Sequence, residues 1–136
     1  MELLFVSNGM RNEFASHTDF GFLRGLFDEK PNILPSNVDM IYGINGQFLL
    51  AEWKRENEEI LLGQRILLKS LAQQPNFTVL IVNGYSDSTG THVDSFYQVA
   101  SDKLIYIDKS VDMLKEYIKT WFTLVFKKDS KVLFNL

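Results

Sequence analysis

Residues 38–54 read VDMIYGINGQFLLAEWK, two apolar runs on either side of Asn45-Gly46. Asn-Gly between apolar runs is the strongest short-range signal for a β-hairpin with a two-residue turn. A two-residue turn sets Ile44 opposite Gln47 and fixes the pairing of every residue further along both strands. The same register places Asp39 directly opposite Glu52. The sequence therefore predicts an antiparallel hairpin with two carboxylates facing each other.

Opposed residues of a hairpin have Cβ atoms about 4.5–5.5 Å apart and point to the same face, so Asp39 and Glu52 should be close neighbours. Lys54 lies two residues beyond Glu52 and shares that face. Large apolar side chains occupy both faces of the hairpin: Ile41, Phe48 and Leu50 on one, and Val38, Met40, Tyr42, Leu49 and Trp53 on the other. We therefore expect both faces to be buried, as in a sheet covered by helices.

Two opposed carboxylates destabilise a hairpin unless a positive partner lies between them, and burial sharpens that cost. Mg²⁺ or Mn²⁺ is the natural partner, because hard divalent ions prefer carboxylate oxygens and can bridge them to a phosphate. Lys54 could orient an attacking water and neutralise developing negative charge. The alternative is a solvent-exposed ion-pair cluster of these acids with Lys54 or Arg55, which contributes about 0–1 kcal/mol.

The residues after the hairpin predict a helix over 57–72 and a strand over 77–82, both of which favour a βαβ crossover with parallel strands. Gln64 lies on the apolar row of this helix, and a buried amide needs a hydrogen-bond partner. It either reaches the carboxylates or substrate, or is a core amide satisfied by backbone. Gly63 either permits close helix–sheet approach or merely weakens the helix.

The remaining segments predict a single α/β domain. We expect one helix, or two, within 11–27, and a loop over 28–37 because Pro31 and Pro35 oppose helix and central strand alike. A polar loop over 83–94, strands over 95–99 and 104–107 paired around residues 101–103, and a helix capped by Asp108 or Ser110 follow. The tail after Lys127 is expected to form a last strand or a docking arm.

Composition narrows the classes of protein. The 136 residues include 46% apolar and 23% charged residues, as in an ordinary globular domain. The absence of cysteine excludes disulfides, thiolate zinc sites and a cysteine nucleophile. A net charge of −3 argues against a broad basic surface that coats nucleic acid. No apolar run is long enough to span a membrane and no secretory leader is apparent, so we expect a cytoplasmic protein.

This pattern resembles the PD-(D/E)xK nuclease superfamily, and within it the VRR-NUC and Holliday-junction-resolvase-like branches. The resemblance covers about residues 30–84 and consists of Pro35, Asp39, the Glu52-Trp53-Lys54 run and a following helix with Gln64. Val38 departs from it, since the family often has proline there. The resemblance implies a restriction-endonuclease-like core, with a mixed central sheet flanked by helices, as a single nuclease-like domain over residues 1–136.

The family's activity would make the chain a Mg²⁺-dependent endonuclease that cuts branched or flapped DNA in repair, recombination or a mobile element. The resemblance implies that Asp39, Glu52, Lys54 and Gln64 are catalytic. A further acid on the first helix would join Asp39 and Glu52 at the metal; Glu13 is our choice by position and Asp19 its rival. Phosphate contacts are expected from these basic residues: Arg11, Arg24, Arg55, Lys127 and Lys128.

Two other functions fit the same residues. A catalytically degenerate nuclease fold would act as a nucleic-acid or protein binding module, indifferent to added metal. A small α/β protein without a nucleic-acid role would keep Asp39, Glu52 and Lys54 as a plain surface cluster. A homodimer would supply two cutting centres, as resolvases use, although the sequence shows no dimer interface.

Overall fold

The computed structural model describes residues 19–32 and 34–133. The chain divides into two compact units, Met1–Ser36 and Asn37–Leu136. The described part of the first unit holds one short 3-10 helix, η1 (Gly21–Leu23), in place of the helix expected within 11–27. Residues 11–18 of that expected helix lie outside the described residues. The prolines at 31 and 35 lie in a segment without helix or strand, as expected.

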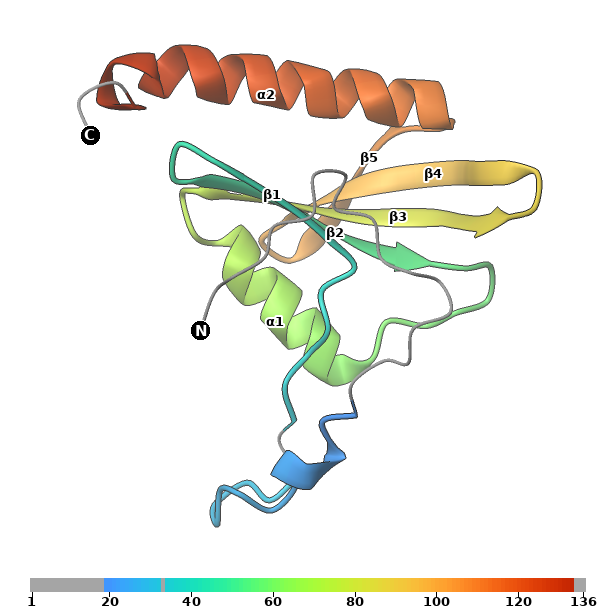
Figure 1. Ribbon diagram of the computed structural model, residues 1–136. Helices are drawn as coiled ribbons and strands as arrows, with labels where there is room; N and C mark the ends of the chain where they lie inside the picture. Colours follow the sequence, from blue (N-terminus) through green and yellow to red (C-terminus); the bar gives the residue numbers. More distant parts are fainter. Residues whose placement is uncertain (1–18, 33, 134–136) are drawn as a thin grey trace, which may run out of the picture. The chain divides into compact units, whose positions relative to one another are not determined.

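The second unit is an α/β structure built on a five-stranded mixed sheet with the order β1-β2-β3-β4-β5 (Figure 1). Only β2 and β3 run parallel, because the helix α1 connects them as a crossover. All other neighbours are antiparallel. The elements are β1 (Met40–Ile44), β2 (Gln47–Lys54), α1 (Leu62–Ala72), β3 (Phe77–Asp87), β4 (Gly90–Ala100), β5 (Lys103–Asp108) and α2 (Val111–Leu133).

The predicted hairpin register is confirmed. Ile44 pairs with Gln47, and the ladder continues to Met40 opposite Ala51. Asn45 and Gly46 have φ values of 55° and 74°, the left-handed conformation that a two-residue hairpin turn requires. The helix is shorter than predicted: α1 begins at Leu62, because residues 55–61 form no helix. A turn covers residues 56–57, and the Arg55 backbone N–H donates to the Glu58 carboxylate at 3.0 Å.

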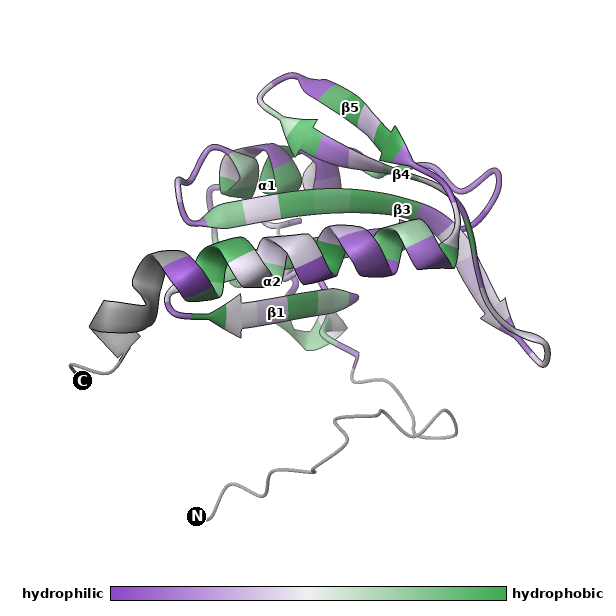
Figure 2. Ribbon diagram, turned by 90° about the horizontal axis from the view of Figure 1, so that it is seen from above, coloured by the Kyte–Doolittle hydropathy of each residue, from purple (hydrophilic) through white to green (hydrophobic). Residues whose placement is uncertain are grey.

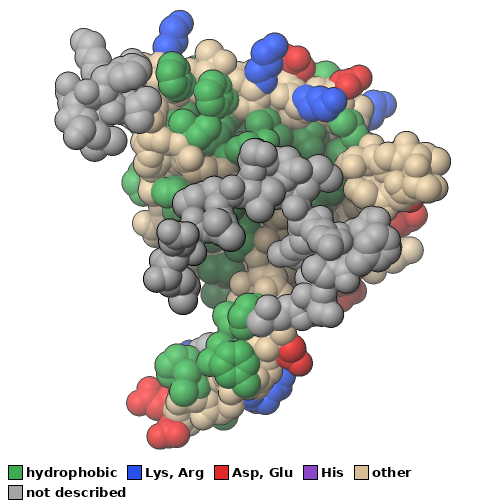
Figure 3. Space-filling view, in the orientation of Figure 1, with side chains coloured by type: hydrophobic (Ala, Val, Ile, Leu, Met, Phe, Trp, Pro, Cys, Tyr) green, Lys and Arg blue, Asp and Glu red, His purple; other side chains and the backbone are tan. Residues whose placement is uncertain are grey.

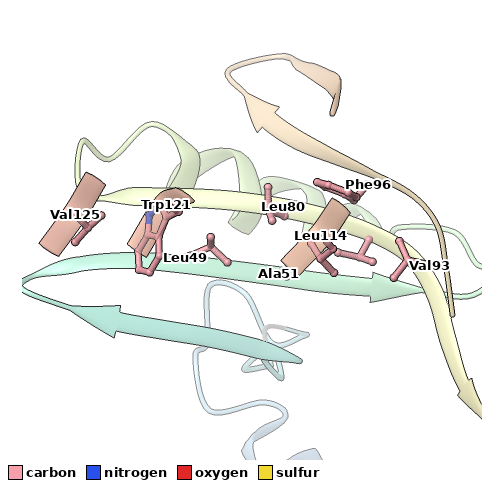
Figure 4. Close-up of a cluster of buried hydrophobic side chains, with 9 residues drawn as sticks. Leu49, Ala51, Leu80, Val93, Phe96, Leu114, Trp121 and Val125 are labelled. Carbon is pink, nitrogen blue, oxygen red and sulfur yellow. The ribbon is translucent and has the colours of Figure 1, made fainter. Parts of the chain in front are cut away.

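The sheet separates two apolar cores. On the α2 side, β2 and β3 pack against α2 through a cluster that includes Leu49, Leu80, Phe96, Leu114 and Trp121 (Figure 4). On the α1 side a smaller cluster joins Leu50, Leu68, Val79, Ile81 and Val99. Figure 2, which looks down on α2, shows the mostly hydrophobic β3 lying between the two helices. Alternate residues of β2 therefore face different cores, and both of its faces are buried.

Burial of both hairpin faces, however, is wrong for β1. Ile41 and Tyr42 are 51% and 45% exposed, although they point to opposite faces. The reason is position: β1 is an edge strand, so it has a neighbour on one side only. Among the contacts that reach it from α2 is the Tyr42–Trp121 ring pair, with centroids 6.4 Å apart. Along the top of Figure 3, where α2 lies, apolar side chains are exposed next to basic and acidic ones.

Two further expectations are wrong. Residues 83–94 are no loop: they form the half of the β3–β4 hairpin nearest its turn, where the polar side chains are compatible with an exposed strand. The tail after Lys127 continues α2 to Leu133 in place of a strand or arm. The β4–β5 hairpin is as predicted, and Ser110 caps α2, its hydroxyl accepting from the Met113 N–H at 3.2 Å. Among the helices of the described residues, none has the length and hydropathy of a membrane span.

Candidate active site

Three polar side chains meet on the α1 side of the sheet. Glu52 and Lys54 lie at the carboxyl end of β2, and Gln64 lies in the first turns of α1. The Gln64 amide donates to Glu52 Oε1 at 2.7 Å, while its Oε1 accepts from Lys54 Nζ at 2.9 Å. Lys54 Nζ is also 3.4 Å from Glu52 Oε1. Gln64 therefore bridges the two charged groups and satisfies both ends of its amide.

Asp39 completes the group from the edge strand. It directly precedes β1, so the ladder ends before it reaches Asp39. Its Oδ2 instead accepts a hydrogen bond of 2.8 Å from the backbone N–H of Trp53, the residue between Glu52 and Lys54. The hairpin thus brings together Asp39, Glu52 and Lys54, and the crossover helix adds Gln64 as the fourth.

The electrostatics of the group favour a cation. Burial raises the pKa of Glu52 above its ordinary value, and the nearby Asp39 carboxylate raises it further. Lys54 and the Gln64 hydrogen bond act in the opposite direction without cancelling the rise. Glu52 and Lys54 are only 6% and 7% exposed. The interpretation as a solvent-exposed ion-pair cluster therefore does not hold for these two residues, although Asp39 is exposed.

Two neighbours of the site were missed from the sequence. Asn83 pairs with Lys54 across the parallel β2–β3 ladder, and Ser95 pairs with Asn83 from β4. The Asn83 amide donates to Ser95 Oγ at 3.0 Å. These two residues extend the polar row from β2 across β3 and β4. The signal in the sequence was a polar residue directly after the apolar run 77–82, but the prediction of a loop over 83–94 obscured it.

An open groove gives access to Asp39. It has a volume of about 500 Å³ and lies where β1, β2 and the β3–β4 hairpin meet. Asp39, Trp53 and Arg55 form one part of its lining, and Tyr85 and Thr91 belong to the hairpin part. Arg55 is exposed there, so the groove places one cation beside the exposed carboxylate of the group.

The remaining predicted site residues lie either outside the described residues or in other parts of the chain. Glu13 and Arg11 lie outside the described residues. Asp19 and Arg24 belong to the first unit, where Asp19 Oδ1 accepts from the Gly21 N–H at 2.8 Å. Lys127 lies near the end of α2. The part of the chain that the structure describes holds no set of three or more acidic or histidine side chains arranged for a metal.

The donor set nevertheless fits Mg²⁺ or Mn²⁺. Asp39 and Glu52 offer two hard carboxylates, and Mg²⁺ commonly uses one or two carboxylates, several waters and a substrate phosphate. Burial is the main cause of the raised pKa of Glu52, and the neighbouring Asp39 carboxylate adds to it, so the negative charges of the two acids are not fully compensated by Lys54. No known protein family, no curated protein and no solved structure matches this chain. The geometry alone therefore supports the interpretation of the site.

Proposed function

We propose that the protein is a metal-dependent deoxyribonuclease with a restriction-endonuclease-like core, acting on branched or flapped DNA. The observation that carries this proposal is the buried Glu52–Lys54–Gln64 group with Asp39 fastened beside it. Burying an acid and a lysine costs several kcal/mol per ion before pairing, and hydrophobic residues could fill the same space. A role in catalysis would explain why Glu52, Lys54 and Gln64, and not apolar residues, occupy the space between β2 and α1.

Each residue has a distinct role in this proposal. Asp39 and Glu52 would hold the Mg²⁺, which when bound activates water and stabilises charge on the scissile phosphate. Lys54, fixed by Gln64 at 2.9 Å, would hold the attacking water and neutralise negative charge as the phosphodiester opens. Arg55 in the groove beside Asp39 would position the DNA backbone without reading its sequence.

The test is cleavage of linear, flapped and four-way DNA by the purified protein, with Mg²⁺, with Mn²⁺ and with EDTA. We expect metal-dependent cutting that Lys54→Met abolishes, since methionine keeps the length of the side chain and removes its charge. Lys115→Met is the matched control, because Lys115 is exposed on α2. Cutting of no substrate by the folded wild type, together with metal-independent DNA binding, would favour the degenerate binding module instead.

A further inference from the structure

A second cavity lies on the same side of the sheet as Glu52 and Lys54. It has a volume of about 260 Å³, opens to solvent on one side, and is lined by α1, β3, β4, the turn after β4 and the start of β5. Leu68, Ile81 and Val99 form its floor, and all three are buried in the α1-side core. The floor of this cavity is therefore apolar and fixed in place by the core packing.

The rim of the cavity is basic, although the whole chain has a net charge of −3. Arg65, Lys69 and Lys103 line it, together with Asp102. Lys69 Nζ lies 3.2 Å from Asp102 Oδ1, so that pair is neutral overall. Arg65 and Lys103 have no ion pair within 4.0 Å among the described residues, and both are exposed. The cavity therefore combines two cations that have no ion-pair partner in the described part of the chain, Arg65 and Lys103, with an apolar floor.

The cavity adjoins the candidate active site through the sheet and the helix. Ile81 of its floor is the residue that pairs with Glu52 across the β2–β3 ladder. Arg65 of its rim directly follows Gln64, which contacts both Glu52 and Lys54. A DNA strand with one phosphate at the candidate active site could therefore place a neighbouring nucleotide in this cavity.

We infer that this cavity binds a single nucleotide, with its phosphate at Arg65 and Lys103 and its sugar or base against the apolar floor. The choice of ligand rests on the proposed function. Cavities for drug-sized ligands begin at about 300 Å³, so this one suits one nucleotide unit at most. The nucleotide could be free or the terminal residue of a DNA strand, since both present the same phosphate and base.

The experiment is an NMR titration of the ¹⁵N-labelled full chain with thymidine 5′-monophosphate in EDTA, where no cleavage can occur. We expect shifts around Leu68, Val99 and Leu104. Arg65→Glu with Lys103→Glu should weaken binding about tenfold or more, because charge-assisted contacts to phosphate are lost and repulsion replaces them. Lys115→Glu, an exposed charge reversal on α2, should bind as the wild type does.

Thymidine and inorganic phosphate serve as the two half-ligands, and each should bind more weakly than the nucleotide. A 5′-phosphorylated oligonucleotide that shifts the same residues identifies a strand end as the source; shifts with the free nucleotide alone identify a free nucleotide. No binding, equal binding of either half-ligand, or unchanged binding by the double variant overturns the inference. EDTA allows binding to be measured without cutting, so the two proposals can fail separately. Cleavage of DNA without nucleotide binding would reject the nucleotide cavity alone. Nucleotide binding without cleavage of DNA would reject the nuclease activity alone.

Discussion

The backbone N–H of Trp53 donates to the Asp39 carboxylate at 2.8 Å, across the open end of the first hairpin. Asp39 is therefore held by a backbone group, since Trp53 is the residue between Glu52 and Lys54 in β2. The bond occupies Oδ2, and Asp39 has no ion-pair partner within 4.0 Å among the described residues. An exposed carboxylate fixed at one oxygen is suited to bind a cation with the other.

Replacement of Asp39 by asparagine should therefore remove metal binding while it preserves the fold. Asparagine keeps a side-chain oxygen for the Trp53 N–H but loses the negative charge. A ligand at one hundred times its Kd stabilises a folded protein by about 2.7 kcal/mol, so Mn²⁺ should raise the Tm of the wild type by several degrees. Thermal melts with Mn²⁺ and with EDTA check this. Asp94→Asn, at an exposed position of β4, should retain the rise, and a full rise in Asp39→Asn would contradict the metal site.

The raised pKa of Glu52 predicts how stability depends on pH. The folded protein holds the Glu52 proton more tightly than the unfolded chain does, so this residue lowers stability as pH rises above about 4.5, through its folded pKa. Glu52→Gln has no such proton. Urea melts from pH 4 to pH 8 should therefore show the stability difference, variant minus wild type, increasing with pH. A difference that stays constant would mean that Glu52 titrates normally.

Gln64→Leu should weaken both the fold and the cutting reaction. Leucine leaves Glu52 and Lys54 without the amide that bonds to both, at 2.7 and 2.9 Å. Loss of a buried hydrogen bond to a charged group costs about 1–3 kcal/mol. We expect a fall of that size in the free energy of unfolding and a slower cleavage rate at saturating DNA. The exposed Gln74→Leu, just beyond α1, is the comparison variant and should change neither quantity by a similar amount.

Gly84→Ala and Gly63→Ala should act in opposite directions. A Cβ at Gly84 would collide with the His92 carbonyl oxygen and approach the Trp53 ring to 3.0 Å, because β3 and β4 shift register at this point. We expect a loss of about 1–3 kcal/mol from such overpacking. A Cβ at Gly63 meets nothing within 4 Å, and alanine should add up to about 1 kcal/mol through helix propensity. Chemical denaturation of both variants checks the pair; equal effects would rule out the close approach at Gly84.

The parts of the fold that local rules govern were predictable. Asn45-Gly46 fixed the hairpin and its register, and the periodicity of α1 together with the apolar run after it gave the parallel crossover. Gly63 does not permit a close approach of helix and sheet, because a Cβ there would meet no atom within 4 Å. The alternative remains, that glycine merely weakens the helix at this position. The shared face of Glu52 and Lys54 followed from the hairpin, whereas the role of Gln64 was left open, and its bonds to both residues favour the alternative in which it reaches the carboxylates.

The remaining errors have a common physical cause, since tertiary pairing overrode local composition. Ser86, Asp87 and Thr91 are typical of loops, yet cross-strand pairing of β3 with β4 keeps them extended. No local pattern tells that β1 would be an edge strand, because edge position depends on the order of all strands. Asn83 and Ser95 reach the candidate site only through that order, and the acid expected at Glu13 lies outside the described residues.

The parallel pairing of β2 with β3 also governs when the site can exist during folding. The first hairpin on its own would leave Glu52 in water, without the burial that raises its pKa in the complete fold. Gln64 and Asn83 arrive only after the chain has passed through α1 and returned alongside β2. The raised pKa of Glu52 therefore depends on contacts between segments that are distant in the sequence. A chain that has not completed this crossover would have the same residues but a less buried Glu52.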